Sequence, residues 1–316
     1  MSQFAVDVRT VESVSPHPNA DRLELATVDG LLYQMVVGKG EFTVGDPAIY
    51  FPLDAVLPEQ LRMTLGLPRN RIKTVKLRGQ ISQGVLVPLH KLPALVPSGA
   101  DLAGALGVTK YEPEECVGQG GARMTTLPAG LSVYDIENAE RHKADWAALL
   151  ASPHVVTEKL EGTNFCAHID EDGVFRVCSR RHTVEEGDNV WWHVARKYNL
   201  PRVLHQMQGS TRNNIAIYGE VIGPKVQGNY YGRPSLELYV FDMKVNGQWL
   251  PWDALGYVIE VEYPDLTLVP VVALENDGRS HIHSALLREG VVVRALYDPR
   301  VVLKLKNKEY LCASTL

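Results

Sequence analysis

The sequence predicts an α+β protein with two domains, a small N-terminal β-barrel and a larger C-terminal domain of strands with a few helices. Three observations lead to this fold class. The chain has 316 residues, which is enough for two separate hydrophobic cores. Residues 4–89 carry short alternating apolar runs without a long helical pattern. After an acidic and glycine-rich segment, helical patterns appear among further strand patterns.

The barrel is predicted from successive short strands that are separated by turn residues. Asp29-Gly30 lies between two apolar runs and is a strong hairpin signal. About five strands and no long helix favour a small closed barrel of the OB-fold type. The segment Ser15–Leu23 is similar to the entry segment of tRNA-binding OB modules, and its prolines suit an extended turn. The strands are expected at residues 4–11, 23–28, 31–37, 47–51 and 85–89.

Residues 62–78 form a basic window without an acidic residue. A strand over 71–78 would place several cations on one face, where they could contact phosphates. The alternative is a solvated edge strand, because lysines on edge strands also block aggregation. No dense aromatic platform accompanies the window, so base stacking is not indicated. The six cations are Arg62, Arg69, Arg71, Lys73, Lys76 and Arg78.

A linker is predicted over residues 113–130, where the composition turns acidic and then rich in glycine. It divides the chain into a domain over 1–112 and a domain over 131–316. In the second domain a helix is expected over 137–150, where apolar residues recur, and Pro153 would end it. Another helix is expected over 191–198 and onward towards Pro201, and the remaining segments read as strands.

Composition limits the other functional classes. The net charge of −5 argues against coating nucleic acid by bulk electrostatics, but it allows a local basic groove. The four cysteines are far apart, which argues against a zinc site or a disulfide framework. Neither a secretory signal nor a membrane-length apolar run is evident. We therefore expect a cytoplasmic protein that has no membrane association and acts as a monomer.

Lys159 is the most informative residue of the chain. It lies between two glutamates and is followed by Gly162-Thr163-Asn164. A lysine amine becomes a nucleophile when burial or neighbouring charge lowers its pKa. The glycine would let such an amine approach a bound phosphate. The simpler interpretation is a solvated lysine on an edge strand.

The stretch Thr157–Phe165 resembles motif I of the covalent nucleotidyltransferases, the ligases and capping enzymes that carry AMP or GMP on lysine. Its Glu-Lys-x-x-Gly-Thr-Asn-Phe form is most similar to RNA ligases. The resemblance implies that Lys159 is the nucleophile and that Glu158 reads the adenine edge. One position departs from the family pattern, because Glu161 stands where an aspartate is usual. Further nucleotide-binding residues implied by the motif are Leu160, Glu161, Gly162 and Asn164.

Four later segments resemble the remaining motifs of this superfamily, in the family's order. Glu220, in Tyr218–Gly223, corresponds to the motif III glutamate, and Glu289, in Glu289–Arg294, to that of motif IV. The resemblance implies that both carboxylates serve catalysis, Glu289 by organising a divalent cation and Glu220 by binding a ribose hydroxyl or a metal-bound water. It also implies an adenine slot between Phe241 of motif IIIa and Val291 of motif IV.

Motif V is represented by Leu303–Asn307, in which Lys304 and Lys306 are two residues apart. Side chains with this spacing leave a strand on one face, so both amines can reach one phosphate. Arg180 lies in a segment similar to motif Ia, where an arginine contacts the nucleotide or the nucleic-acid end. Single motifs of this kind are common in ordinary strands, but five in the correct order are hard to explain by chance.

The whole chain therefore resembles the ATP-dependent RNA ligases of the Deinococcus and Naegleria type, in which an OB domain precedes the transferase domain. This implies a nucleotidyltransferase domain of antiparallel sheets with flanking helices, with ATP and Mg²⁺ or Mn²⁺ as cofactors. The expected reaction joins a 3′-hydroxyl to a 5′-phosphate end of RNA, or of a nicked duplex that contains RNA, through lysyl-AMP. Two alternatives are an ATP-dependent DNA ligase and a non-catalytic RNA-binding protein with a degenerate transferase domain.

Overall fold

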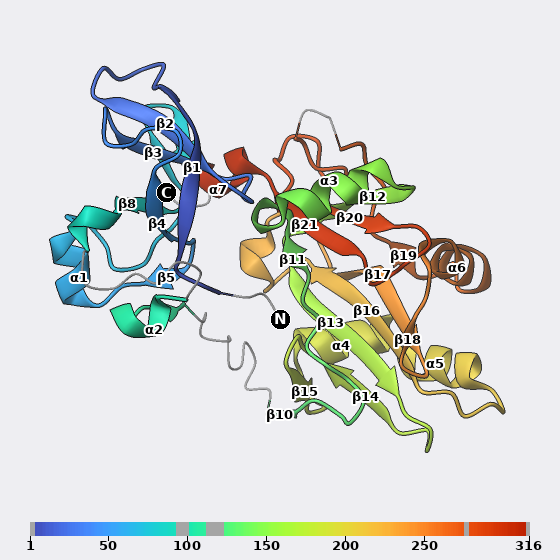
Figure 1. The fold of residues 1–316 in the computed structure, drawn as a ribbon. Helices are drawn as coiled ribbons and strands as arrows, with labels where there is room; N and C mark the ends of the chain where they lie inside the picture. Colours follow the sequence, from blue (N-terminus) through green and yellow to red (C-terminus); the bar gives the residue numbers. More distant parts are fainter. Residues whose placement is uncertain (1–3, 93–100, 112–122, 275–277, 314–316) are drawn as a thin grey trace. The chain divides into compact units, whose positions relative to one another are not determined.

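The computed structural model describes residues 4–92, 101–111, 123–274 and 278–313. The chain divides into two compact units (Figure 1). Unit 1 comprises Met1–Pro113, Glu137–Ala147 and Lys308–Leu316, and unit 2 comprises Glu114–Ile136 and Ala148–Asn307. Cys116 and most of the predicted linker, residues 113–122, lie outside the described residues. Within the described residues, Cys166, Cys178 and Cys312 form no disulfide bond.

Unit 1 is built on an antiparallel five-stranded sheet that forms the predicted OB-type barrel. The strand order is β3-β2-β1-β4-β8. Two strands have the predicted limits, whereas β1 begins later than expected and extends to Pro16, because its second half pairs with β2. The strands are β1 (Asp7–Pro16), β2 (Leu23–Val28), β3 (Gln34–Gly38), β4 (Pro47–Phe51) and β8 (Val85–Pro88).

Two apolar clusters fill the barrel, one around Ile49 and Phe51 and the other around Tyr33, Met35 and Tyr50. Burying a side chain of this size stabilises the fold by about 1.5–3 kcal/mol. The alternating pattern of the strands therefore predicted the barrel correctly. The shorter elements of unit 1 are α1 (Glu59–Thr64), β5 (Ala55–Val56), β6 (Val75–Leu77), β7 (Gln80–Ser82), η1 (Leu89–Lys91), α2 (Ala103–Leu106), β9 (Thr109–Lys110), β11 (Glu137–Asn138), η2 (Ala139–Arg141) and α7 (Lys308–Ala313).

The basic window does not form the strand that was expected over residues 71–78. Only Val75–Leu77 is a strand, β6, and it pairs with β7 in a short hairpin. Arg62 instead binds Glu59 at 2.6 Å. Arg71 binds Asp54 at 2.7 Å and lies 3.4 Å from the centroid of the Tyr111 ring. Both acidic partners lie outside the window, and Asp54 is 17 residues from Arg71, so sequence proximity did not predict that pair.

Unit 2 contains a large, mainly antiparallel sheet with the strand order β10-β15-β14-β13-β16-β17-β18, in which β19 also pairs with β17 (Figure 1). Met124–Thr126 was expected to belong to the linker, but it forms β10 and pairs with β15. The strands are β10 (Met124–Thr126), β13 (Thr163–Ile169), β14 (Phe175–Cys178), β15 (His182–Val184), β16 (Ile215–Ile222), β17 (Glu237–Val245), β18 (Gln248–Trp249) and β19 (Thr267–Leu268).

The pairing of β16 with β17 contains a β-bulge. Tyr218 faces Asp242, whereas the next residue, Gly219, faces Val240. Phe241 therefore has no partner on β16. A bulge adds one residue to a strand and re-aims the side chain at that position.

A second sheet in unit 2 is formed by β12 (His154–Lys159), β20 (Gly290–Ala295) and β21 (Val302–Lys306). All pairs are antiparallel, with β20 in the centre. The register places Lys159 opposite Gly290 and Gly290 opposite Lys306. Directly opposite residues share a face of the sheet, so Lys159 and Lys306 project on the same side.

Helices cover the core of the large sheet. Helix α4 (Val190–Lys197) begins at Asn189, whose side chain accepts a hydrogen bond from the N–H of Trp192. The predicted continuation is wrong, because Asn199 adopts φ +49° and a separate helix, α5 (Leu200–Gln208), follows. The remaining helices of the unit are α6 (Trp252–Tyr257), the π-helix η4 (Val258–Glu262) and the 3₁₀-helix η3 (Gln227–Asn229).

The helix predicted over 137–150 is shorter than expected. It is α3 (Lys143–Ala151), and it is preceded by β11 and η2. The Asn138 side chain accepts a hydrogen bond from the N–H of Glu140, which favours a cap over a continuous helix. Across the described ranges, no helix is long and apolar enough to span a membrane.

Candidate functional site

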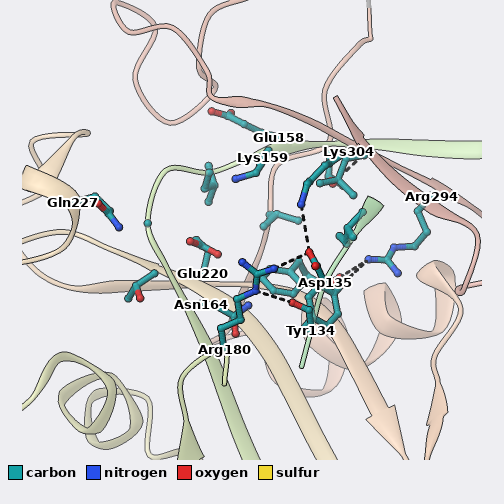
Figure 2. A pocket seen from close by; sticks show the side chains of 18 residues that line it. Tyr134, Asp135, Glu158, Lys159, Asn164, Arg180, Glu220, Gln227, Arg294 and Lys304 are labelled. Atoms are coloured by element: carbon teal, nitrogen blue, oxygen red, sulfur yellow. Dashed lines mark hydrogen bonds and ion pairs between the residues drawn. The ribbon is translucent and has the colours of Figure 1, made fainter. Parts of the chain in front are cut away.

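A pocket with a volume of about 350 Å³ lies in unit 2 and brings together segments that are far apart in the sequence (Figure 2). Its walls come from β12, β13, β16, β17, β20 and β21 and from the segment before β11. The predicted residues that line it are Glu158, Lys159, Leu160, Gly162, Asn164, Arg180, Glu220, Phe241 and Lys304. The lining residues that the sequence analysis missed are Tyr134, Asp135, Ile136, Thr157, Thr163, Gln227, Val269, Val292 and Arg294.

Lys159 is the last residue of β12, and its amine forms an ion pair with Glu289. Glu289 also lies 3.4 Å from the amine of Lys306. The side chain of Glu289 is 8% exposed and that of Lys159 is 25% exposed. One carboxylate therefore joins the lysine of motif I to the second lysine of motif V, although neither Glu289 nor Lys306 lines the pocket itself.

The charge balance at Lys159 differs from the expectation that cations would lower its pKa. Burial acts to lower the pKa of the amine, but Glu289, Glu220 and Glu161 together outweigh burial and raise it. An opposite charge nearby favours the charged form of an amine. Lys159 is therefore an ammonium group in the free protein at neutral pH.

Glu220 lies near Lys159 but has no ion pair within 4 Å in the described part of the chain. Burial raises its pKa to about 8, and the nearby carboxylates of Glu289 and Glu161 add to this, while Lys159 opposes it. Its position is fixed by β16, where it lies directly opposite Asn164 of β13. The site thus holds a carboxylate that an added cation would favour in its ionised form.

Lys304 lies on the same face of β21 as Lys306 and contacts Asp135 at 3.5 Å. Burial lowers the pKa of Lys304 to about 8, and the charges of Lys159, Lys306 and Arg180 contribute to the decrease. Asp135 also binds Arg180 at 2.7 Å. Asp135 therefore anchors two cations at the pocket, as Figure 2 shows.

The apolar part of the pocket contains Phe241, which packs 5.0 Å from Tyr134 between ring centroids. The β20 valine that lines the pocket is Val292, whereas Val291, the predicted second wall, is not among the lining residues. Val291 is opposite Glu158, whereas Val292 is opposite Thr157, and successive strand residues face opposite sides. Val291 is instead almost fully buried.

A buried polar network supports Phe241. Arg294 binds the Asp242 carboxylate at 2.8 Å and donates to the Phe241 carbonyl at 3.4 Å. The Tyr134 hydroxyl donates to the same carboxylate at 2.8 Å. Burial raises the pKa of Asp242 even though Arg294 opposes the increase. The network fixes the strand that carries Phe241 to the strand that carries Val292.

Glu158 and Glu161 flank Lys159 but occupy different surroundings. The Glu158 carboxylate accepts a hydrogen bond from the N–H of His281 at 2.7 Å, and burial raises its pKa. Its Oε1 atom is buried and has no hydrogen-bond partner among the described residues. Glu161 does not line the pocket, although its charge acts on Lys159 and Glu220.

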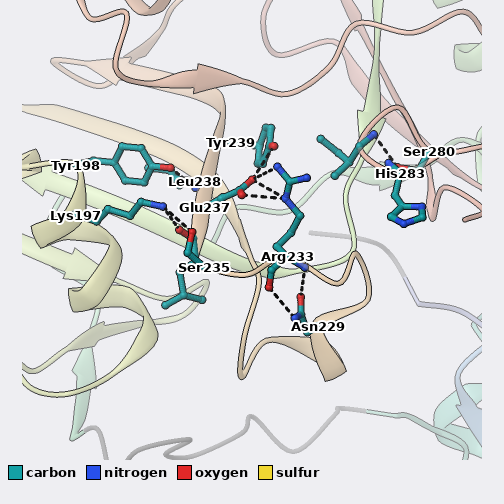
Figure 3. Close-up of polar contacts among 12 residues, drawn as sticks. Lys197, Tyr198, Asn229, Arg233, Ser235, Glu237, Leu238, Tyr239, Ser280 and His283 are labelled. Carbon is teal, nitrogen blue, oxygen red and sulfur yellow. Dashed lines mark hydrogen bonds and ion pairs between the residues drawn. The ribbon is translucent and has the colours of Figure 1, made fainter. Parts of the chain in front are cut away.

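Gln227 reaches the pocket from a loop with an unusual backbone. Lys225, Gln227 and Asn229 all have positive φ values, between 41° and 67°. Figure 3 shows how the loop is held: Asn229 exchanges two hydrogen bonds with the backbone of Arg233, and Arg233 binds Glu237 at 2.8 Å. Strained backbone of this kind persists only where surrounding contacts hold it, and it is frequent at functional sites.

Gly290 allows the strands around the two lysines to approach closely. A Cβ atom at this position would lie 2.3 Å from the Leu305 carbonyl oxygen and 2.9 Å from Lys306 Cα. Both are backbone atoms, which cannot rotate away. We predict that Gly290→Ala separates β20 from β21, destabilises the protein and reduces lysine modification by nucleotide.

The matched control for this prediction is Gly256→Ala in helix α6, where the added Cβ would meet no atom within 4 Å. This change should stabilise the protein by about 0.5–1 kcal/mol, because alanine favours a helix over glycine. Urea unfolding of both variants measures the difference. Equal unfolding midpoints for the two variants would show that Gly290 has no steric role.

The fold and the pocket together define a ligase of the nucleotidyltransferase type, in which an OB barrel precedes, along the chain, a domain that surrounds a lysine with carboxylates and further lysines. Residues 152–306 match the RNA ligase family, and residues 5–89 match an OB-fold domain family. The protein belongs to the RNA ligase family.

Solved structures of the RNA ligase of Naegleria gruberi are similar over nearly the whole chain. The complex with PPi has a TM-score of 0.81 and 26% identity, and it covers 98% of both chains. A mutant with AMP and Mn has a TM-score of 0.83 at 26% identity, and another with ATP and Mn has 0.81 at 27%, with the same coverage. The β subunit of phenylalanine–tRNA ligase from Geobacter sulfurreducens is 32% identical over 117 residues, or 33% of this chain. The match spans 14% of that relative's length.

Proposed function

We propose that this RNA ligase uses ATP to join a 3′-hydroxyl to a 5′-phosphate end through lysyl-AMP at Lys159. The observation that carries the proposal is the position of Lys159 in a pocket between two carboxylates and near two further lysines. The similar Naegleria enzyme has been solved with ATP, with AMP and with PPi. A pocket that held only a structural ion pair would not need this arrangement of cations.

In the first step, the neutral amine of Lys159 attacks the α-phosphate of ATP, a nitrogen–phosphorus bond forms, and pyrophosphate leaves. The amine must lose its proton before the attack, and Glu289 is the carboxylate in contact with it. Lys304 and Lys306 would hold the phosphate as point charges, because their amines leave the same strand face. Covalent catalysis of this type divides one difficult step into easier steps.

The carboxylates fit a hard divalent cation. Among the described residues, no three His, Cys, Asp or Glu side chains are grouped closely enough to hold a metal ion by themselves. Mg²⁺ commonly binds through one or two carboxylates together with waters and substrate phosphates. Glu289 and Glu220 would supply these carboxylates, and the raised pKa of Glu220 marks a group that a cation would stabilise. When bound, Mg²⁺ or Mn²⁺ would neutralise the charge on the phosphates.

The adenine ring would lie between Phe241 and Val292, which both line the pocket. Glu158 would accept a hydrogen bond from the 6-amino group, because its Oε1 atom is buried without a partner among the described residues. Guanine has an acceptor, O6, where adenine has this donor. An unprotonated carboxylate would therefore select ATP over GTP.

In the later steps, AMP passes to the 5′-phosphate end, and the 3′-hydroxyl then displaces AMP. Leu160, Gly162 and Asn164 would contact the nucleotide from the turn after Lys159, with Glu161 acting through its charge. Arg180 would contact the nucleotide or the RNA end from the rim of the pocket. We further propose that the protein acts as a cytoplasmic monomer, with a barrel domain over 1–112 and a transferase domain over 131–316, joined by a linker over 113–130 that contributes β10 to the large sheet.

The test of this function compares nicked duplexes that differ only in the sugar at the 3′ end of the nick. We expect sealing with a 3′-terminal ribose and much weaker sealing with deoxyribose, because the 2′-hydroxyl distinguishes RNA from DNA. Equal sealing would favour a DNA ligase. RNA binding without any transfer of AMP would favour the non-catalytic alternative.

A further inference from the structure

The hairpin formed by β6 and β7, together with the residues that lead into it, carries most of the unpaired positive charge of unit 1. Lys73, Lys76 and Arg78 are exposed, as is Arg69 a few residues earlier. Within the described part of unit 1, these four side chains have no ion pair. We call residues 73–82 the basic hairpin. Such a local concentration stands out in a chain with a net charge of −5.

Of the other lysine and arginine residues in the described part of unit 1, six pair with a nearby acid, and the longest of these pairs joins Lys308 to Glu140 at 3.9 Å. Each of the other five pairs has a nitrogen–oxygen distance of 2.6–2.8 Å. Among the described residues, Arg69 and the three cations of the basic hairpin therefore differ from these six in having no ion pair. The five pairs are Arg9–Asp7, Arg62–Glu59, Arg71–Asp54, Lys91–Glu41 and Lys143–Glu12.

The basic hairpin also exposes apolar side chains. Val75 is 44% exposed and Leu77 is 41% exposed, and their spacing places both on one face of the strand. β6 and β7 form a sheet of only two strands. Exposed lysines on such a hairpin could serve only to prevent aggregation. That role would not require two apolar residues to remain exposed beside them.

Contacts with the loop between β1 and β2 fix the tip of the basic hairpin. His17 Nε2 donates to the Leu77 carbonyl at 3.1 Å, and the Asn19 side chain donates to the Arg78 carbonyl at 3.0 Å. At the other strand, the N–H of Val36 donates to Ser82 Oγ at 3.0 Å. Arg78 has φ +46°, so the turn holds a conformation that an arginine rarely adopts. The cations are thus presented on an ordered support.

We propose that the basic hairpin binds the RNA substrate away from the reacting ends. Lys73, Lys76 and Arg78 contact backbone phosphates, while Val75 and Leu77 pack against sugar or base surfaces. Phosphate contacts fix the position of a nucleic acid without reading its sequence. This inference rests on the proposed function, because it assigns a second contact surface for the same RNA.

The test measures the salt dependence of binding to a nicked RNA duplex. The variant is Lys73→Ala/Lys76→Ala, and the matched control is Lys91→Ala/Lys143→Ala, which removes the same charge from cations that are already paired. Each phosphate contact contributes about −0.9 to the slope of log affinity against log salt. We expect the hairpin variant to lose about 1.8 from this slope, because two contacts are removed. The control should keep the wild-type slope.

Lysyl-AMP formation in the absence of RNA is measured in parallel. It should be unchanged in the hairpin variant, since these residues lie outside the pocket, and unchanged labelling also shows that the variant is folded. Equal salt slopes in the hairpin variant, the control and the wild type would overturn the inference. If the wild type itself forms no lysyl-AMP, the proposed function is wrong. The salt dependence of RNA binding by the hairpin variant still decides whether the basic hairpin binds RNA.

Discussion

Lys159→Ala is expected to abolish the transfer of label from ATP, labelled at the α-phosphate, to the protein. The amine is the only atom of this side chain that can form the nitrogen–phosphorus bond, so no residual rate is expected from the pocket alone. The measurement is a denaturing gel after incubation with Mg²⁺ or Mn²⁺. Lys197→Ala is a suitable control, because that lysine binds Ser235 and the Leu236 carbonyl and does not line the pocket.

The pH dependence of this labelling follows from the raised pKa of Lys159. Burial acts to lower the pKa of the amine, but the three surrounding glutamates raise it above the ordinary value of 10.5. The reactive neutral form is therefore scarce at neutral pH and increases about tenfold for each pH unit below the pKa. We expect the labelling rate at saturating ATP to rise with pH over the neutral and mildly alkaline range.

Two results would contradict the covalent mechanism. One is a labelled band of normal intensity in Lys159→Ala, and the other is a labelling rate that falls as pH rises from 6 to 8 at saturating ATP and metal. Labelling by GTP in place of ATP would instead indicate a capping-type enzyme, and it would remove the proposed role of Glu158.

Breaking the buried ion pair between Arg294 and Asp242 should have the largest effect on stability. Both side chains are almost completely buried, with 5% and 3% exposure. Arg294→Met leaves the Asp242 carboxylate without its cation, and Asp242→Leu leaves the guanidinium without its anion. Removing one partner of a buried pair costs about 3–5 kcal/mol, because the other charge stays buried.

The double variant Arg294→Met/Asp242→Leu separates this cause from simple loss of packing. It leaves no uncompensated charge, so its free energy of unfolding should fall by less than the sum of the two single changes. Urea unfolding provides the measurement. Arg300→Ala is the control, because Arg300 binds Asp298 on the surface and should be almost neutral. Additive effects of the two buried changes would show that the pair is not coupled.

The same variants should also reduce labelling by ATP. Arg294 donates to the Phe241 carbonyl, and Asp242 is adjacent to Phe241 on β17. A loss of labelling without a loss of stability would mean that Arg294 contacts the nucleotide directly, since it also lines the pocket.

The sequence predicted the parts of the fold that depend on local pattern. The β2 and β4 strands have the expected limits because alternation and turn residues define them. The helix over 137–150 was overestimated because a side-chain cap at Asn138 is as favourable locally as another helical turn. The strand expected over 71–78 was wrong in its extent, because Arg71 binds Asp54, which is distant in the sequence, and only Val75–Leu77 is a strand.

The residues of the candidate site also divide into those that the local sequence pattern predicted and those that only the tertiary fold brings to the pocket. Motif spacing identified Lys159, Glu220 and Lys304, which line one pocket. It predicted Val291, whereas Val292 lines the pocket; which valine faces the pocket depends on the register between β12 and β20, and neither strand alone determines that register. Asp135 was missed for a related reason. It lies in an irregular segment, and only the tertiary fold brings it to Lys304 and Arg180.

The β-bulge in β17 has a consequence for how base preference can change in this enzyme. Phe241 is the extra residue of the bulge and has no cross-strand partner on β16. Its side chain can therefore be exchanged without altering a matched pair in the ladder, whereas Val240 and Asp242 on either side of it are paired with Gly219 and Tyr218. The bulge separates the proposed contact with the base from the pairing of the strands, so the proposed stacking residue can vary without breaking a cross-strand pair.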